Sequence, residues 1–461
     1  MNIRVIILFL LFLFCSAKTV FSQNIIWDIR DGWVVKKISQ DLPFEKHFAI
    51  GMWGIPGYKF NKASHKAEQN QFSENIKIYS KNMVHVNSLY VQSSFEKNYM
   101  RNLTWVIGTS ELSSFFKKNY LKEQKDASYY MMQKMKKDVN TVFFDSGLTN
   151  YIKTILNKIN NPTKNFIWAP IDEVASGFQS WYWPISVTEK TYSIIKKQTP
   201  NNLVFIDLGG SAGSSFFFDK YYMEKHKSVL HKTPPYGMLS NKKTGYLDLE
   251  DFRYDYSGNS IFEYPKGKRA RKKYDDISIK KFWYENTKEI ASAYKKSGDI
   301  FGTNAFSYFY QYPQLAGVTV NAIKAGTGNN SPVWLFFDGN GYAKPQRVSI
   351  DSYLKNIKCQ IYISIIHGAT GVFFWNDPKK GTVFFEKLRP IIDELKRNEI
   401  VFKYQSIEKK LDENIQYEIK QSSTGERYLI VINSNKNKKI SISYPIKRNL
   451  DPLEVYITKL N

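Results

Sequence analysis

Asn165-Phe-Ile-Trp-Ala-Pro-Ile-Asp-Glu-Val-Ala-Ser-Gly-Phe178 is the stretch around which the rest of the chain can be interpreted. Its apolar run, residues 166–169, is typical of a strand buried on both faces of a parallel sheet. Pro170 limits further sheet pairing, and Asp172 and Glu173 follow at once. Carboxylates at the end of a buried strand can act as general acids and bases, or they can cap the next helix.

Strand and helix patterns alternate along the chain on both sides of this stretch. Apolar strand patterns lie at 48–57, 83–91, 104–108, 166–169, 203–208, 299–306, 332–337 and 371–377. Helical periodicity fills most of the intervals between them. This alternation predicts an α/β protein with a (β/α)8 TIM barrel over residues 23–400, in preference to a doubly wound sheet. Neither a GxGxxG turn nor a phosphate loop follows any of these strands.

Two regions depart from the alternation. From 211 to about 279 no long periodic segment appears, and this insertion carries the basic run Lys266-Gly-Lys-Arg-Ala-Arg-Lys-Lys273. An insertion of this length is often a lid or a binding loop, whereas a basic run is often only a solvated surface. Beyond residue 401 the segments become short and alternating, which predicts a small antiparallel β-sandwich over 401–461.

The amino-terminal segment and the charge bear on localisation and partners. Residues 1–22 have the pattern of a secretory signal, and their apolar core is too short to span a bilayer. We therefore expect an exported protein, located in the periplasm, on the outer surface or in the medium. The net charge of +24 would attract an anionic glycan, although a solvated lysine-rich surface gives the same balance. No nucleic-acid-binding motif accompanies the charge, so nucleic acid is not an expected partner.

Acids and aromatic residues concentrate at the carboxyl ends of the predicted strands, where TIM-barrel enzymes carry their catalytic groups. The candidates are Glu111, Asp172, Glu173, Asp207, Asp338 and Asp377, with the aromatics Trp53, Tyr308, Tyr310 and Trp375. A carboxylic acid can protonate a glycosidic oxygen, and aromatic faces can stack on sugar rings. Metal-ligand spacing of histidines and a GxSxG elbow are both lacking, so no metal, cofactor or serine-esterase chemistry is expected.

Three segments carry a resemblance to a known family: Trp168-Ala-Pro-Ile-Asp-Glu173, Gly298-Asp-Ile-Phe-Gly-Thr-Asn304 with Tyr308, and residues 362–375. In these segments and in layout the chain resembles retaining glycoside hydrolases of the clan A barrel type, in particular beta-galactosidase-like barrels of Bacteroidetes. The resemblance implies that Glu173 is the general acid/base and that Trp375 is a sugar platform. It also implies that Asp172 stands where the family has an Asn that binds the sugar 2-hydroxyl.

The end of the seventh strand departs from the family pattern. The family's nucleophile is a Glu at this place, whereas this chain has Asp338, which is one methylene shorter. Catalysis is sensitive to shifts of about 1 Å. Asp338 therefore serves in an adjusted pocket, or another acid such as Asp207 or Glu111 takes the role, or the site is inactive. Asp338 in Asp-Gly-Asn-Gly is also a good turn former.

The expected function is that of an exported glycoside hydrolase, which cleaves a poly- or oligosaccharide by carboxylate acid/base chemistry. Two alternatives remain open. One is an inactive carbohydrate-binding barrel, and the other is a binding protein for an acidic surface polymer.

Overall fold

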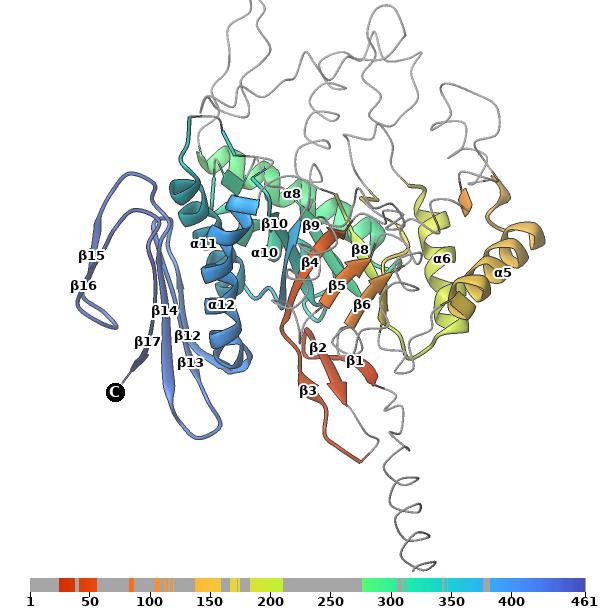
Figure 1. Ribbon diagram of the computed structural model, residues 1–461, viewed down its shortest axis with the longest axis horizontal. Coiled ribbons are helices and arrows are strands. Elements are labelled where there is room, and N and C mark those ends of the chain that lie inside the picture. The colour runs from red at the N-terminus through yellow and green to blue at the C-terminus, as the bar shows by residue number, and fades with distance from the viewer. Residues whose placement is uncertain are drawn as a thin grey trace, which may run out of the picture.

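The structure is a computed structural model, shown in Figure 1. It describes residues 25–37, 41–55, 83–86, 104–107, 112, 115–116, 119, 137–158, 166–171, 173–174, 183–209, 276–304, 309–310, 312–341, 344–345, 347–375 and 382–460. The predicted signal segment lies outside these residues. So does the predicted insertion up to residue 275, while residues 276–279 of that insertion begin a helix.

In the described part of the chain, eight parallel strands form one central sheet. They are β4 (Ala49–Ile55), β5 (Met83–Val86), β6 (Thr104–Ile107), β7 (Phe166–Trp168), β8 (Phe205–Asp207), β9 (Ile300–Asn304), β10 (Val333–Asp338) and β11 (Gly371–Trp375). Neighbouring strands follow one another in sequence, and β11 pairs with β4. One parallel bridge, between Trp168 and Val204, joins the remaining edges at β7 and β8. The sheet therefore curves back on itself, without a continuous ladder at this last junction.

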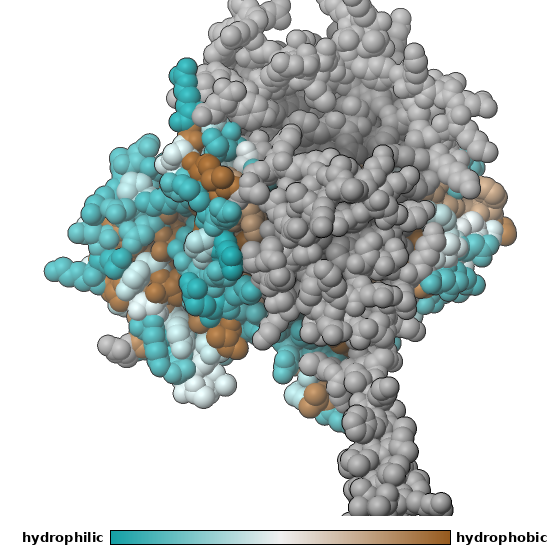
Figure 2. Space-filling view, in the orientation of Figure 1, coloured by the Kyte–Doolittle hydropathy of each residue, from teal (hydrophilic) through white to brown (hydrophobic). Residues whose placement is uncertain are grey.

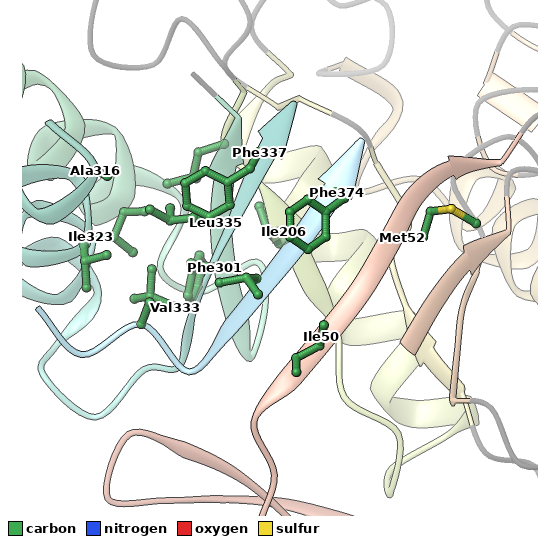
Figure 3. Packing of buried hydrophobic residues seen from close by; sticks show 14 of the residues in the cluster. Ile50, Met52, Ile206, Phe301, Ala316, Ile323, Val333, Leu335, Phe337 and Phe374 are labelled. Carbon is green, nitrogen blue, oxygen red and sulfur yellow. The ribbon is translucent and has the colours of Figure 1, made fainter. Parts of the chain in front are cut away.

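Helices connect the strands and pack on the outer face of the sheet (Figure 1). They are α5 (Val142–Lys158), α6 (Ile185–Gln198), α8 (Asp276–Tyr294), α10 (Leu315–Thr327), α11 (Ile350–Ile366) and α12 (Thr382–Lys403). Figure 3 shows Leu335 of β10 directed toward Ala316 and Ile323 of α10, in the large cluster that joins sheet and helices. None of the helices in the described residues is long and apolar enough to cross a membrane.

Aromatic rings fill the inner face of the curved sheet. Side chains alternate between the two faces of a strand, so Trp334 and Phe336 of β10 point inward while Leu335 points outward. The ring of Trp334 lies 5.4 Å from that of Phe205 and 5.2 Å from that of Phe373. This packing leaves no room for a side chain at Gly302, where a Cβ would collide with the Trp334 carbonyl oxygen and the Phe205 ring.

An antiparallel sheet that the sequence patterns do not predict lies beside the start of the strands of the central sheet. It consists of β1 (Ile26–Arg30), β2 (Trp33–Lys37) and β3 (Glu45–Lys46). Trp27 and Val34 from this sheet join the inner aromatic cluster. Asp31 and Gly32 connect β1 to β2 with φ values of 51° and 74°. Positive φ at both central residues is the geometry of a two-residue hairpin turn.

The carboxyl-terminal region is antiparallel. One sheet contains β12 (Gln405–Leu411), β13 (Ile415–Gln421), β14 (Arg427–Asn433) and β17 (Val455–Leu460), and a second contains β15 (Ile440–Ile442) and β16 (Arg448–Leu450). Ile430 and Ile432 of β14 join the core under the helices of the central sheet, whereas Leu429 and Val431 pack with Leu450 in a separate cluster. The four-stranded sheet thus has one face on these helices and the other toward the small sheet.

Polar groups are also buried where the four-stranded sheet meets the barrel helices. His367 directly follows α11. Its Nε2 lies 3.1 Å from the Oε1 of Gln416 in β13. Burial lowers the pKa of His367 to about 4. Burial also lowers the pKa of His47, next to Trp27, well below its usual value. Both imidazoles are therefore neutral in the folded protein near neutral pH.

We predict that Gly302→Ala lowers the free energy of unfolding by about 1–3 kcal/mol, because the added methyl group must displace backbone and ring atoms of the filled interior. The matched control is Gly147→Ala in α5, where a Cβ would lie 3.6 Å from the Phe115 ring. This control should stabilise by about 0.5–1 kcal/mol, since Gly is unfavourable within a helix. Urea unfolding measures both. A neutral Gly302→Ala would contradict the filled interior.

We also predict that acid weakens the fold before carboxylates are protonated. The His367 imidazole has a folded pKa of about 4 against 6.5 when unfolded, so its contribution is fully present above pH 6.5 and is lost as pH falls toward 4. At about 1.4 kcal/mol per pH unit, this loss approaches about 3 kcal/mol. The slope of unfolding free energy against pH should become shallower in His367→Gln, and His47 should account for part of the remaining slope.

Candidate functional site

The inward alternation of the strands continues to their carboxyl ends. Residues two apart in a strand share a face, so Asp338 follows Phe336, and Asp207 follows Phe205. In register, Asp338 pairs with Trp375 of β11, and Trp375 pairs with Trp53 of β4. The aromatic interior therefore ends in a layer that contains acids and a tryptophan. For Trp53 only the backbone position is described.

The structure brings Glu173 and Asp207 together through a third residue, Asn304. The Asn304 Nδ2 donates to Glu173 Oε1 at 2.8 Å and is 3.3 Å from Asp207 Oδ2. Both distances are measured from the same Asn304 nitrogen, so the Glu173 and Asp207 carboxylate oxygens are at most about 6 Å apart. They lie about 5 Å apart where each takes its own hydrogen of the planar amide. Asp207 is buried, with Oδ1 accepting from the Gly209 amide at 2.8 Å.

Glu173 has an unusual backbone conformation, with φ of 46°. Its neighbour Val174 holds it there, because the Val174 amide donates to the Asp207 carbonyl at 2.8 Å. On the other side, the Tyr294 hydroxyl of α8 lies 3.2 Å from the Val174 carbonyl and 2.6 Å from that of Trp183. A non-glycine residue in this left-handed region costs of order 1–3 kcal/mol, and such residues cluster at functional sites.

Asp338 is held by its own turn. Its Oδ1 accepts from the amides of Asn340 (3.0 Å) and Gly341 (2.8 Å), and its Oδ2 accepts from the Tyr353 hydroxyl at 2.9 Å. Burial, with Asp338 close by, raises the pKa of Tyr353 well above its usual value, so the phenol stays a donor. These contacts fit the turn-forming alternative, while a nucleophilic role for Asp338 stays a prediction.

The other sequence candidates are placed unevenly. Trp375 is partly buried, at the end of β11, and the Tyr310 ring lies 5.1 Å from that of Tyr353. Glu111, Asp172, Tyr308 and Asp377 lie outside the described residues. No group of three or more metal-ligating side chains occurs in the part of the chain that is described. Asn304 is a further site residue that is not among the sequence candidates, although its position at the end of an apolar strand is the same signal that selects Asp207.

Comparisons with known proteins give weak likenesses. No family model matches the chain, and no curated protein matches it in sequence. Solved structures with some similarity include a family 39 glycoside hydrolase from Bacteroides cellulosilyticus WH2, with 9% identity over 90% of this chain and 79% of that one and a TM-score of 0.41. SrfJ from Salmonella typhimurium has 8% identity over 90% and 89%, with a TM-score of 0.43.

An endocellulase from Pyrococcus horikoshii has 10% identity over 81% of this chain and 99% of that one, with a TM-score of 0.36. Glycoside hydrolases are thus among the proteins to which this chain is similar. At these identities and TM-scores the likeness does not establish a shared fold or activity, so the site has to be interpreted from its own geometry.

We predict that Asn304→Ala lowers the free energy of unfolding by about 1–3 kcal/mol, because two carboxylates lose the donor that they share. The control is Asn119→Ala, in which the Asn119 Nδ2 loses one hydrogen bond of 2.8 Å to the Phe115 carbonyl, and the loss should be about 0.5–1.5 kcal/mol. Thermal and urea unfolding measure both variants. Equal losses of unfolding free energy in the two variants would show that the two carboxylate contacts of Asn304 add no stability beyond one ordinary hydrogen bond.

Proposed function

We propose that this chain is an exported glycoside hydrolase with a (β/α)8 barrel. The observation that carries the proposal is the meeting of Glu173 and Asp207 at one amide group, at the carboxyl ends of consecutive strands. The position of Glu173 after β7, the fourth strand of the barrel, supports it, as this is where the family resemblance places a general acid/base. A carbohydrate is the substrate class that two carboxylates beside aromatic side chains serve best.

The spacing of the two acids favours one stereochemical course. Retaining glycosidases have carboxyl groups about 5–5.5 Å apart, whereas inverting enzymes need about 6.5–9.5 Å to admit a water molecule. The Glu173–Asp207 separation of at most about 6 Å is closer to the retaining range. We therefore assign Asp207 as the second carboxylate, ahead of Asp338, because Asp207 shares the Asn304 amide group with Glu173.

The proposed reaction has two displacements. In the first, the protonated Glu173 gives its proton to the glycosidic oxygen as the bond to the anomeric carbon breaks, and the Asp207 carboxylate forms a bond to that carbon. In the second, the Glu173 carboxylate takes a proton from water, whose oxygen attacks the anomeric carbon and releases Asp207. Trp375 and Tyr310 would offer aromatic faces to the sugar, and the net charge of +24 would favour an anionic glycan.

A second candidate function rests on the state of Asp338. Its carboxylate occupies the place of the family's nucleophile but is engaged by two amides and a phenol. If the family arrangement is the one that matters, this chain is a carbohydrate-binding barrel without turnover. Such a protein would bind the same glycan and leave its glycosidic bonds intact.

We predict that Glu173→Gln lowers turnover of a natural glycoside by about 10²–10⁴-fold, because a positioned general acid contributes that much. Gln keeps an acceptor for Asn304, so the fold should persist. An aryl glycoside with an acidic phenol as leaving group needs little protonation, and its bond-cleavage step should lose far less. Initial rates on a panel of natural and aryl glycosides measure the difference.

The companion variants are Asp207→Asn and Asp338→Asn. Loss of turnover in Asp207→Asn, with folding retained by circular dichroism, supports the assignment. Turnover lost only in Asp338→Asn moves the second role to Asp338. A wild-type protein that binds glycans in calorimetry but cleaves none of the panel would contradict the hydrolase and favour the binding barrel.

A further inference from the structure

The loop between β14 and β15, residues 434–439, is built by asparagine side chains. The Asn433 Nδ2 donates to the carbonyls of Lys438 (2.8 Å) and Leu450 (3.1 Å). The Asn435 Oδ1 accepts from the amides of Asn437 and Lys438, both at 2.9 Å. Asx turns of this kind fix the backbone locally. The loop therefore presents the side chain of Lys436 in a defined direction.

Lys436 reaches from this loop to the barrel. Its Nζ donates to the Tyr310 carbonyl and lies 4.7 Å from the centre of the Tyr310 ring. The same carbonyl accepts from Asn356 Nδ2 of α11 at 3.1 Å. Nearby, Gln314 Nε2 donates to the Ser434 carbonyl at 3.2 Å, so the loop has a second attachment to the segment that follows β9.

Tyr310 connects this attachment to the candidate site. It lies in the segment after β9, and its ring packs 5.1 Å from the ring of Tyr353. Tyr353 in turn donates its hydroxyl to Asp338 at the end of β10. Lys436 of the carboxyl-terminal region thus contacts Tyr310, and Tyr310 is linked to Asp338 through Tyr353.

We infer that Lys436 is a positioning residue, which holds Tyr310 as an aromatic face of the substrate site from the carboxyl-terminal domain. The inference rests on the proposed glycosidase function, because it assigns Tyr310 a sugar to contact. It gives the small domain a defined role, that of fixing one wall of the site in the barrel.

The chemistry of Lys436 favours this role over simple packing. Within the described residues no carboxylate pairs with it, and burial lowers its pKa to about 8. A partly buried cation held by a carbonyl and a ring face is costly, whereas an apolar side chain would fill the same space without that cost. A charged side chain at this position is therefore explained by a need to fix the position of Tyr310.

The test compares Lys436→Met, which keeps the length and apolar stem, with Lys436→Arg, which keeps the charge. Lys438→Met in the same loop is the matched control, since Lys438 is exposed. With a glycoside that the wild-type enzyme cleaves, we expect Lys436→Met to raise KM about tenfold with kcat within about twofold. Lys436→Arg should restore KM substantially, and Lys438→Met should not change it.

The pH dependence of KM gives a readout that a packing role would not move. The wild-type KM should rise above pH about 8, where Lys436 loses its proton, and the rise should be absent in Lys436→Arg. Among the described residues, the titratable groups that face Lys436 and Tyr310 are Cys359 and Tyr353. Burial raises the pKa values of both, and also that of Tyr310, so none of them should titrate near pH 8.

Hydrogen exchange of the peptide 309–316 separates this inference from the enzyme assignment, because it needs no substrate. Exchange should be faster in Lys436→Met than in wild type and near wild type in Lys436→Arg. Unchanged exchange in Lys436→Met overturns the inference whatever the enzyme assay gives. Faster exchange with an unchanged KM also overturns it, since the loop would then be held without effect on the site.

Discussion

Aromatic packing inside the curved sheet is the constraint on which the rest of the structure depends. Trp334, Phe205 and Phe373 occupy the inner face, and Gly302 makes the room that they need. Because these rings fill the interior, the next inward-facing side chains lie beyond them, at the carboxyl ends of the strands. Asp207 occupies such a position, at the end of β8 and on the same face as Phe205.

The same alternation of inward and outward side chains determines how much of the fold could be predicted from the sequence. Every predicted barrel strand segment overlaps a strand of the sheet, because strands buried on both faces appear as apolar runs. The hairpin at Asp31-Gly32 carries a strong sequence signal, yet it stands outside the strand–helix alternation and is not in the prediction. The exposed strand β12 has no apolar period, so it gives no such signal.

The site was less accessible from sequence, because its key contacts depend on distances between strands. Asp207 follows from the end of its strand, whereas the role of Asn304 depends on a shared hydrogen bond that no local pattern encodes. The Asp-Gly-Asn-Gly pattern at Asp338 did indicate a turn, and the two amides on its Oδ1 agree with that reading. Sequence could offer both roles for Asp338 but could not count its hydrogen bonds.

Two features of this site oppose the stability of the fold, and they favour a chemical role for it. Glu173 sits at φ of 46°, where a glycine would be unstrained, and Asp207 is a carboxylate almost fully removed from solvent. The amide of Val174 and the hydroxyl of Tyr294 hold Glu173 in this conformation, and Gly209 and Asn304 donate hydrogen bonds to the buried Asp207 carboxylate. A fold selected for stability alone would discard such an arrangement, whereas an enzyme that must keep two acids close together would retain it.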